Sequence, residues 1–304
     1  MAQKIILDVD TGGDDAVAIL LAGHHSSVDL VAVTVCHGNG PLEVTLDNTL
    51  RVLQAGQLEK TPVYAGSVHP IIGDLIQSHP IQKSILPLPP ARITPTPGRA
   101  VDFIVDYYLG SNGPETIYAP TGPQTNLALA LRLEPAIARR IPRIVTMAGA
   151  FTEGNTTPSA EFNILADPEA AHIVFNSGIP ITMVGLEVTA RAFITLADID
   201  RLAEINTPQA RVAAEIIRNE VNWFIDNLGL EGGQIFDASA VAAIIDPEII
   251  QTRKMHVNIE LHGTLTRGRT VADISGYHPV KQNVDVGIDI DRVHFLEILY
   301  KGLS

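Results

Sequence analysis

Short runs of β-branched and other apolar residues alternate along the chain with longer stretches whose apolar residues recur at helical spacing. The short runs predict strands at residues 5–9, 28–35, 62–65, 115–119, 143–148 and 180–186. The longer stretches predict helices over residues 14–21, 42–53, 102–109, 124–133, 168–176 and 208–227. Near-continuous apolar strands that alternate with helices are typical of a mostly parallel sheet flanked by helices. The expected fold class is therefore α/β.

Two features modify this pattern without dividing the chain. Residues 257–266 alternate apolar and polar positions more strictly, so this stretch is expected to be antiparallel or peripheral. Prolines gather between 87 and 97 in an irregular connection that a helical pattern soon follows, which favours a single domain over residues 1–304. Long loops are expected at 70–98 and 225–236, and long loops at the rim of a sheet often serve as lids.

Composition narrows the class of protein. Of the 304 residues, 46% are hydrophobic and 18% charged, which excludes a disordered, collagen-like or coiled-coil chain. The net charge of −13 and the lack of a basic run argue against nucleic acid as a partner. The single cysteine, Cys36, excludes an intrachain disulfide, and no apolar run reaches the ~18 residues of a membrane span. No signal peptide precedes the first strand pattern, so a cytoplasmic protein is expected.

The strongest local signal is an acidic turn between the first predicted strand and the first predicted helix. Its sequence, DVDTGGDD, places four aspartates around two glycines. Ligands of open α/β sheets bind at the carboxyl ends of strands, and oxygen ligands alone suit a hard cation such as Ca²⁺ or Mg²⁺. Such crowded carboxylates are costly unless a cation or a helix N-terminus compensates them. The alternative is that Asp14 or Asp15 caps the helix while Asp8 and Asp10 are solvated, but four aspartates together favour a metal site.

The first half of this turn also resembles the opening of the haloacid-dehalogenase-like phosphatases. That resemblance implies Asp8 as the nucleophile and Asp10 as the acid of a Mg²⁺-dependent phosphohydrolase. The family also needs a later lysine and a further acidic pair at a strand end, and the chain has neither in a suitable context. A phosphohydrolase is therefore kept as the alternative enzyme.

The complete turn from Asp10 to Asp15 resembles the signature of the nucleoside hydrolases, also called inosine-uridine preferring nucleoside N-ribohydrolases. Further segments follow that family in the correct order between residues 4 and 300, namely His37-Gly38-Asn39, Pro120–Asn126, Met147, Gly154-Asn155, Ala160–Ile164, Asp167–Ala171 and Thr270–Asp273. Several separated motifs in order argue against a chance match. The resemblance implies a Rossmann-like α/β fold, usually assembled as homodimers or homotetramers.

The resemblance also implies roles for individual residues. A Ca²⁺ ion would be held by the carboxylates of Asp10, Asp15 and Asp237 and by the main-chain carbonyl of Thr121. Asp10 would in addition be the general base that activates a calcium-bound water for hydrolysis of a ribonucleoside to ribose and free base. The residues expected to contact the ribose are Asp14, Asn39, Met147, Asn155, Glu161 and Asn163.

These residue types suit the cleavage of an N-glycosidic bond. Glycoside hydrolysis passes through an oxocarbenium-like sugar, so a positioned base contributes about 10²–10⁴-fold and nearby oxygens stabilise the growing positive charge. Asn39 and Asn155 lie next to glycines and could instead have turn roles, whereas Asp167 before Pro168 is interpreted as a helix N-cap and left out of the site. The acidic and amide-bearing segments contain no Lys or Arg, which favours nucleosides over nucleotides.

The sequence departs from the family at the base-binding end. In the familiar purine/pyrimidine hydrolases, a histidine thought to protonate the leaving base precedes the last calcium-binding aspartate, whereas this chain has Phe236 there. His79 could replace the lost donor, or the leaving group could depart without help. Phe236, Phe224 and Trp223 could also stack on a purine, although Phe224 and Trp223 could equally be helix-packing residues and His79 a surface residue. The loss of the histidine also leaves open a catalytically inactive riboside-binding protein.

Overall fold

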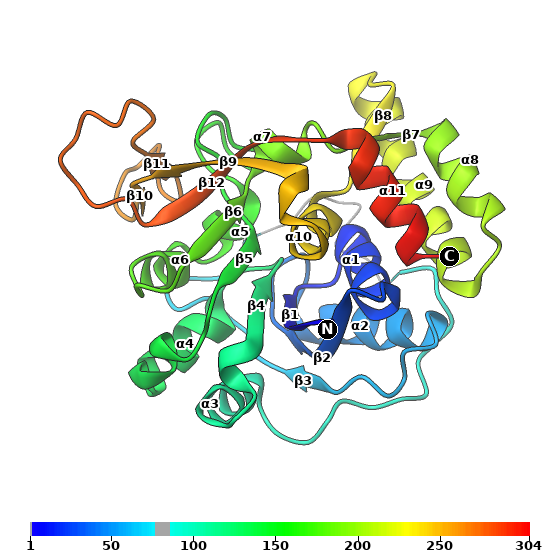
Figure 1. Cartoon of the computed structure of the whole chain (residues 1–304), viewed down its shortest axis with the longest axis horizontal. Coiled ribbons are helices and arrows are strands. Elements are labelled where there is room, and N and C mark those ends of the chain that lie inside the picture. The colour runs from blue at the N-terminus through cyan, green and yellow to red at the C-terminus, as the bar shows by residue number, and fades with distance from the viewer. Residues whose placement is uncertain (1, 77–85) are drawn as a thin grey trace.

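The computed structural model describes residues 2–76 and 86–304 and is built around an eight-stranded sheet (Figure 1). From one edge to the other, the strands are β3 (Val63–Ala65), β2 (Val28–Val35), β1 (Gln3–Val9), β4 (Thr116–Pro120), β5 (Ile144–Met147), β6 (Ile181–Val184), β12 (Val284–Ile290) and β9 (Ile250–Met255). Neighbouring strands are parallel apart from β9, which runs antiparallel to β12. The predicted α/β class with a mostly parallel sheet is therefore confirmed.

The strand order reverses between β1 and β4. From β1 the chain moves outward through β2 to β3, and it then returns to β4 on the other side of β1 before continuing to β5 and β6. This is the doubly wound Rossmann arrangement, in which ligands bind beside the reversal at the carboxyl ends of the strands. The main-chain N–H of Thr121 donates to the carbonyl of Asp8 at 2.8 Å, so the acidic turn and the end of β4 meet at this point.

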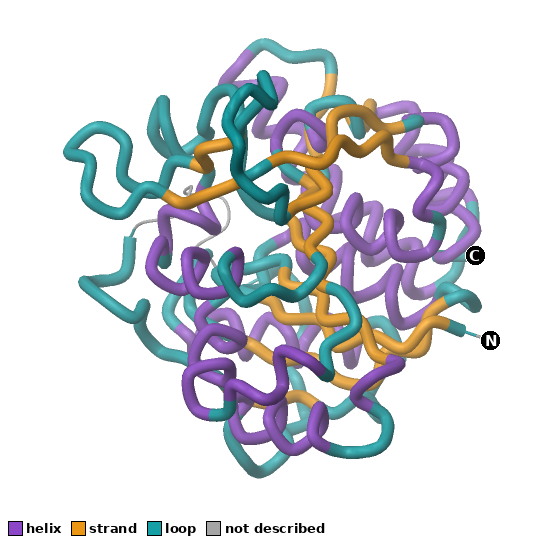
Figure 2. Tube along the Cα trace, turned by 60° about the vertical axis from the view of Figure 1, so that its left-hand side comes forward, coloured by secondary structure: helices purple, strands orange, loops and turns teal. Residues whose placement is uncertain are grey.

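Helices cover both faces of the sheet (Figures 1 and 2). One face packs against α1 (Gly13–His24), α2 (Leu42–Ala55), α9 (Pro208–Leu228), α10 (Phe236–Ile245) and α11 (Arg292–Gly302). The other face packs against α3 (Ala100–Leu109), α4 (Thr125–Leu133) and α6 (Pro168–Phe175). The remaining helices are α5 (Phe162–Ala166), α7 (Leu186–Thr189), α8 (Leu196–Glu204) and the 3₁₀ turns Gly113–Glu115, Pro135–Arg139 and Pro247–Ile249.

The central strand shows why this sequence forms two layers. Successive side chains of a strand point to opposite faces, and Ile5 and Leu7 of β1 enter the core that contains α1, whereas Ile6 enters the core that contains α3 and α4. Each of these side chains is fully buried, and such burial contributes roughly 1.5–3 kcal/mol per side chain. Helix α1 is buried continuously from Gly13 to Ala22, which makes it the central helix beside the sheet.

The stretch 257–266 forms less strand than its alternation predicts. Only β10 (Val257–Ile259) is extended, and it pairs antiparallel with β11 (Thr270–Ala272) outside the main sheet. The antiparallel, peripheral character is therefore confirmed, but the predicted length is wrong because Gly263 lies in a turn that reverses the chain.

The expected long loop at 225–236 is also wrong. Helix α9 continues to Leu228 and ends at Gly229, whose left-handed conformation (φ 66°) lets the chain turn at once. β8 (Gly232–Gln234) then pairs antiparallel with β7 (Phe193–Thr195). Of the other expected loop, residues 77–85 lie outside the described residues.

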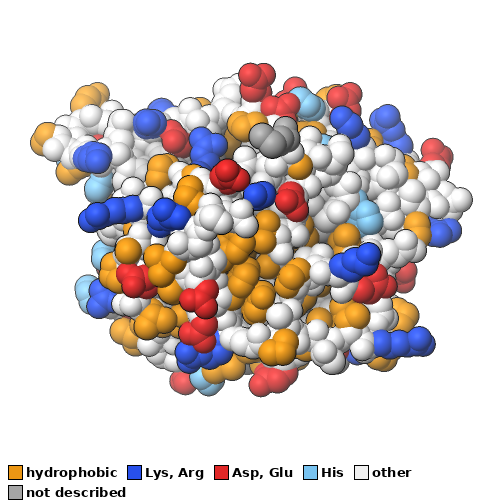
Figure 3. All heavy atoms as spheres, turned by 60° about the horizontal axis from the view of Figure 1, so that its bottom comes forward, with side chains coloured by type: hydrophobic (Ala, Val, Ile, Leu, Met, Phe, Trp, Pro, Cys, Tyr) orange, Lys and Arg blue, Asp and Glu red, His pale blue; other side chains and the backbone are white. Residues whose placement is uncertain are grey.

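The face at the bottom of Figure 1 carries both apolar and charged side chains. Apolar side chains gather at the centre of this face, and basic and acidic side chains are interspersed around them (Figure 3). This face has no continuous basic area of the kind that binds a nucleic-acid backbone. In the described parts of the chain, no helix combines the length and the apolar character needed to cross a bilayer.

Candidate active site

The carboxyl ends of the central strands open into one cavity of about 650 Å³. Asp10 directly follows β1, Asn39 lies in the turn after β2, Thr121 directly follows β4, and Met147 ends β5. The residues predicted from the sequence that line this cavity are Asp10, Asp14, Asn39, Thr121, Met147, Asn155, Glu161, Asn163, Trp223, Phe224, Phe236 and Asp237. Asp15 is fully buried beside them, so residues spread over most of the sequence converge on one place.

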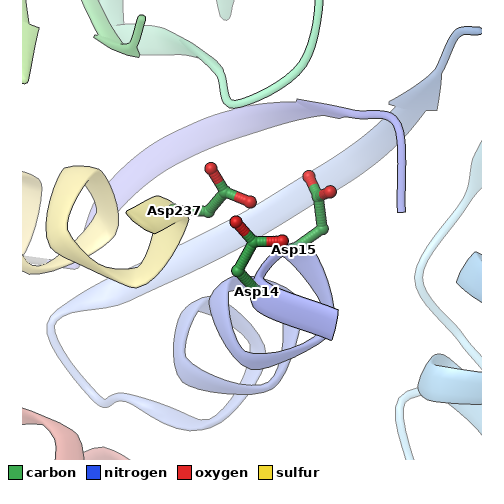
Figure 4. Close-up of side chains that lie close together, drawn as sticks. All are labelled: Asp14, Asp15 and Asp237. Carbon is green, nitrogen blue, oxygen red and sulfur yellow. The ribbon is translucent and has the colours of Figure 1, made fainter. Parts of the chain in front are cut away.

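Three carboxylates form a compact acidic group at the cavity (Figure 4). Asp14 and Asp15 come from the first turn of α1, and Asp237 comes from the first turn of α10. One oxygen from each carboxylate lies within 4.8 Å of the others, and all three side chains are buried. Asp10, which was expected to be a metal ligand, is not a member of this group, whereas Asp14, expected to contact ribose, is.

Burial and mutual repulsion both disfavour the charged form of this acidic group. Burial, with a contribution from the charge of Asp15, raises the pKa of Asp14 to about 7. Burial also raises the pKa of Asp237 well above its usual range, and the charges of Asp14, Asp15 and Asp10 raise it further. A cation among the three carboxylates would offset both costs. Because every donor is an oxygen, the group fits a hard divalent ion.

Asp10 lies in a close-fitting cradle of backbone. Its Oδ2 accepts the main-chain N–H of Asn39 at 2.6 Å. A Cβ at Gly38 would lie 2.1 Å from Oδ2, and one at Gly122 would lie 2.5 Å from Oδ1, so the carboxylate needs glycine on both sides. Burial and the neighbouring charge of Asp15 raise the pKa of Asp10 well above its usual range, and a raised pKa makes a carboxylate a better proton acceptor.

On the side predicted to bind ribose, Asn163 links two strand ends. Its Nδ2 donates to the main-chain carbonyl of Thr121 at 2.6 Å and to that of Met147 at 3.1 Å. The hydroxyl of Thr121 in turn donates to Oδ1 of Asp15 at 2.8 Å. The carbonyl predicted to be a metal ligand is therefore held in place next to the acidic group.

Glu161 has a structural partner that the sequence did not indicate. Its carboxylate caps α5 and accepts the main-chain N–H groups of Gly149 and Asn163, each at 2.8 Å. Burial raises its pKa in spite of these hydrogen bonds. Helix capping thus accounts for a buried acid at this position, and the same side chain also lines the cavity. Asn155 is exposed at the rim, where its Oδ1 accepts the N–H of Phe162 at 3.0 Å.

Three aromatic side chains form an aromatic wall of the cavity. Trp223 and Phe224 of α9 lie edge to face, with ring centroids 5.5 Å apart, and Phe236 begins α10. A phenyl ring at this position can stack on a base but has no proton to donate. His79, the other predicted donor, lies outside the described residues.

Asp8 and Asp167, which the sequence motifs also contain, do not line the cavity. Asp8 is fully buried, and its Oδ1 accepts hydrogen bonds from the hydroxyl of Thr34 at 2.6 Å and from the amide of Asn126 at 2.8 Å. Burial raises its pKa to about 6. This enclosed position does not favour Asp8 as a phosphatase nucleophile. Asp167 caps α6 through the N–H of Ala170 at 3.0 Å, as its sequence context predicted.

The cavity also includes polar residues that the sequence analysis missed. Glu220 of α9 and Gln234 of β8 both line it. Glu220 lies within an amphipathic helix that carries other charged residues, so its local sequence is that of a solvated acid. The sequence signal that could have identified Gln234 as a site residue is its position two residues before Phe236.

The chain is similar to known proteins along nearly its whole length. The family model described as inosine-uridine preferring nucleoside hydrolase matches residues 5–297. The chain is 40% identical over 297 residues to the pyrimidine-specific ribonucleoside hydrolase RihB of Escherichia coli (strain K12), covering 96% of this chain and 94% of that protein. It is also similar to the structure of a purine-preferring ribonucleoside hydrolase from Gardnerella vaginalis (31% identity, TM-score 0.90, 99% and 98% covered). An inosine-guanosine nucleoside hydrolase structure is similar as well (27% identity, TM-score 0.87, 99% and 98% covered).

Proposed function

Since the chain belongs to the family of inosine-uridine preferring nucleoside hydrolases, we propose that it is a Ca²⁺-dependent enzyme that cleaves ribonucleosides to ribose and free base. That it is a ribonucleoside hydrolase, acting on N-glycosyl bonds, follows from the family. The proposal concerns the metal, the roles of the residues and the leaving base. The observation that supports it most is the convergence of the predicted residues on one cavity.

The metal in this proposal is held by Asp10, Asp15, Asp237 and the carbonyl of Thr121, with Asp14 close by. Support comes from the buried, oxygen-only donor set and from the repulsion that a cation would relieve. When bound, Ca²⁺ would orient the attacking water and the sugar hydroxyls. Calcium titration of Asp237→Asn and Asp14→Asn tests this assignment. Substitution of the metal ligand Asp237 should weaken Ca²⁺ binding more than substitution of Asp14, which is assigned to the ribose.

In this proposal, side chains of the protein accept the proton of the attacking water and bind the ribose. Asp10, fixed in its glycine cradle, takes the proton of the attacking water. Asp14, Asn39, Asn163 and Glu161 hold the ribose and lower the energy of the positive charge that develops on its ring. Met147 and Asn155 border the same space and would complete the surroundings of the sugar.

Phe236 makes the reaction depend on the quality of the leaving group. The ring replaces a proton donor with a stacking surface, and Phe224 and Trp223 extend that surface along the cavity wall. We therefore expect kcat to differ among inosine, uridine and an aryl riboside whose leaving group has a low pKa, with the aryl riboside fastest. Equal kcat values on all three substrates would contradict this part of the proposal.

The substrate is a nucleoside with an uncharged 5′ end. Among the described residues that line the cavity, there is no Lys or Arg to neutralise a phosphate. A nucleoside and its 5′-monophosphate, compared by kcat/KM, test this point directly. We expect the nucleoside to be strongly preferred.

One experiment tests the whole proposal. A panel of nucleosides is assayed for released reducing sugar with added Ca²⁺, after exhaustive chelation, and after Ca²⁺ is restored. Activity should vanish with the metal and return with it, and Asp10→Ala should remain inactive throughout. Full activity after verified metal removal would reject the metal site. Phosphate release from a phosphomonoester without nucleoside cleavage would instead support the phosphohydrolase, and tight riboside binding without turnover would support an inactive binding protein.

The proposal also includes a homodimer or homotetramer that works in the cytoplasm. Exposed apolar side chains gather at the centre of the face in Figure 3 and offer a surface that a second copy could cover. Light scattering coupled to size-exclusion chromatography measures the mass of the assembly. A monomeric mass of 32.6 kDa would contradict the oligomer.

A further inference from the structure

Glu220 lies where a helical acid is least expected. It belongs to the middle of α9 and is only 6% exposed, yet it has no basic side chain among the partners that the structure records. Its carboxylate accepts the main-chain N–H of Asp14. An added Cβ on Gly13 would lie 2.0 Å from Glu220 Oε1, so the carboxylate rests directly against the backbone of the acidic turn.

A buried acid next to other carboxylates has an electrostatic cost. The charges of Asp14 and Asp15 both oppose the ionised form of Glu220. A polar but uncharged side chain would avoid that repulsion, and an apolar one would avoid the desolvation as well. The contact of Glu220 with the backbone of the acidic turn, rather than its charge, is therefore the feature that can serve the site.

The helix that carries Glu220 also carries part of the aromatic wall. Residues three and four apart lie on the same face of a helix, and Trp223 and Phe224 stand at these spacings from Glu220 and line the same cavity. One face of α9 therefore contacts the acidic turn through Glu220, and one helical turn later it borders the expected position of the base through Trp223 and Phe224. Helix α9 therefore connects the acidic turn, which Glu220 contacts, with the aromatic wall.

We propose that Glu220 is a positioning residue that holds the main chain of Asp14 and Asp15 in the geometry needed to bind the metal, and that glycine at position 13 is required for this contact. The inference rests on the proposed metal site. It concerns how the protein arranges the site rather than which residues touch the ion. The hydrogen-bond acceptor is the feature that matters, and glutamine can supply it as well as glutamate.

The first test measures Ca²⁺ affinity of the full chain by titration calorimetry, with the metal alone as the ligand. Glu220→Ala should weaken binding about tenfold, because a buried hydrogen bond is lost. Glu220→Gln keeps an acceptor and should stay within about threefold of the parent protein. Glu215→Ala, an exposed acid on the same helix, is the control and should change nothing. At saturating Ca²⁺, Glu220→Ala should regain most of its kcat.

A second test uses Gly13 as an independent probe. Gly13→Ala pushes the carboxylate of Glu220 out of its place and should weaken Ca²⁺ binding at least as much as Glu220→Ala. Once the glutamate is shortened, the atom nearest to the new methyl group is Cγ2 of Ile216 at 3.1 Å, a contact that a small shift of that side chain relieves. The double variant should therefore bind Ca²⁺ no more weakly than Glu220→Ala. Additive losses in the double variant would show that the two positions act separately and would overturn the inference.

The outcomes also separate this inference from the proposed function. If the parent protein binds no Ca²⁺, the metal site and this inference both fail. If the parent binds Ca²⁺ but Glu220→Ala binds it equally well, only this inference fails. A glutamine variant as weak as the alanine variant would assign the effect to charge and would equally overturn it. Thermal unfolding of the metal-free variants completes the test, since a purely structural role would lower the Tm of Glu220→Ala, whereas a positioning role leaves it unchanged or higher.

Discussion

The acidic group should make the metal-free protein less stable than it could be, and Asp237→Asn tests this. One oxygen of Asp237 lies within 4.8 Å of the oxygens of Asp14 and Asp15. Two unit charges at that separation repel by about 3.5 kcal/mol at an effective dielectric constant near 20. Asparagine removes the charge, keeps the shape and can donate a hydrogen bond to Asp14. We expect the free energy of unfolding of the metal-free variant to rise by about 3 kcal/mol at pH 8.

The gain should depend on pH in a defined direction. The pKa of Asp14 is about 7 in the folded protein, and that of Asp237 is also raised, whereas both are near 3.8 in the unfolded chain. As the pH falls from 8 towards 5, the folded protein therefore takes up protons before the unfolded chain does, and the folded parent protein becomes relatively more stable. Protonation relieves the same repulsion that the substitution removes. The difference between Asp237→Asn and the parent should accordingly shrink as the pH falls.

Urea unfolding after chelation measures these free energies, and the control is Asp106→Asn on the exposed side of α3. Added Ca²⁺ should stabilise the parent protein in proportion to the logarithm of its concentration but should hardly affect Asp237→Asn. A metal-free Asp237→Asn that is less stable than the parent at pH 8 would refute the reasoning. It would mean that the carboxylates of this group stabilise the fold without an ion.

Three other substitutions test separate contacts. Burial lowers the pKa of His37 to about 4, so His37 takes up its proton in the unfolded chain first as the pH falls. Between about pH 6.5 and 4, the free energy of unfolding of the parent should therefore fall by up to about 3 kcal/mol relative to that of His37→Gln, as measured by urea unfolding. Parallel pH curves for the two proteins would contradict this. Gly38→Ala places a Cβ 2.1 Å from Oδ2 of Asp10 and should lower kcat by about 10²-fold, whereas Gly178→Ala meets no atom within 4 Å and should not. Glu187 accepts the N–H groups of Phe151 at 2.9 Å and of Thr152 at 2.8 Å, so Glu187→Ala should loosen the loop before α5 and raise KM roughly tenfold; a fall in kcat at constant KM would count against that role.

The sequence predicts the half of the sheet that begins the chain better than the half that ends it. The strands from β1 to β6 are nearly continuous apolar runs between helices, so their pattern is unambiguous. β12 was not predicted, because its sequence VDVGIDI interleaves acids and a glycine with apolar residues. β9 exposes four of its six residues at the edge of the sheet and has no apolar pattern to detect. The order of the strands is decided by pairing between distant segments, which periodicity does not contain.

The candidate site divides in the same way. Aspartates around two glycines at a strand end are a local signal, so Asp10, Asp14 and Asp15 could be named directly. Asp237 lacks such a signal and was reached only through the family resemblance. Glu220 was missed because its burial depends on the packing of α9 against Gly13. No pattern within a helix reports what its acidic residues meet across a tertiary contact.

The acidic group joins α1 to α10, which lie far apart in the sequence, and this has a consequence for protein synthesis. In a growing polypeptide, Asp237 is added more than 200 residues after Asp14 and Asp15. Until then the acidic group lacks one of its three carboxylates, and the proposed metal site lacks one of its ligands. Metal uptake should therefore report the completion of folding, and a chain truncated before α10 should neither bind the ion nor benefit from its presence.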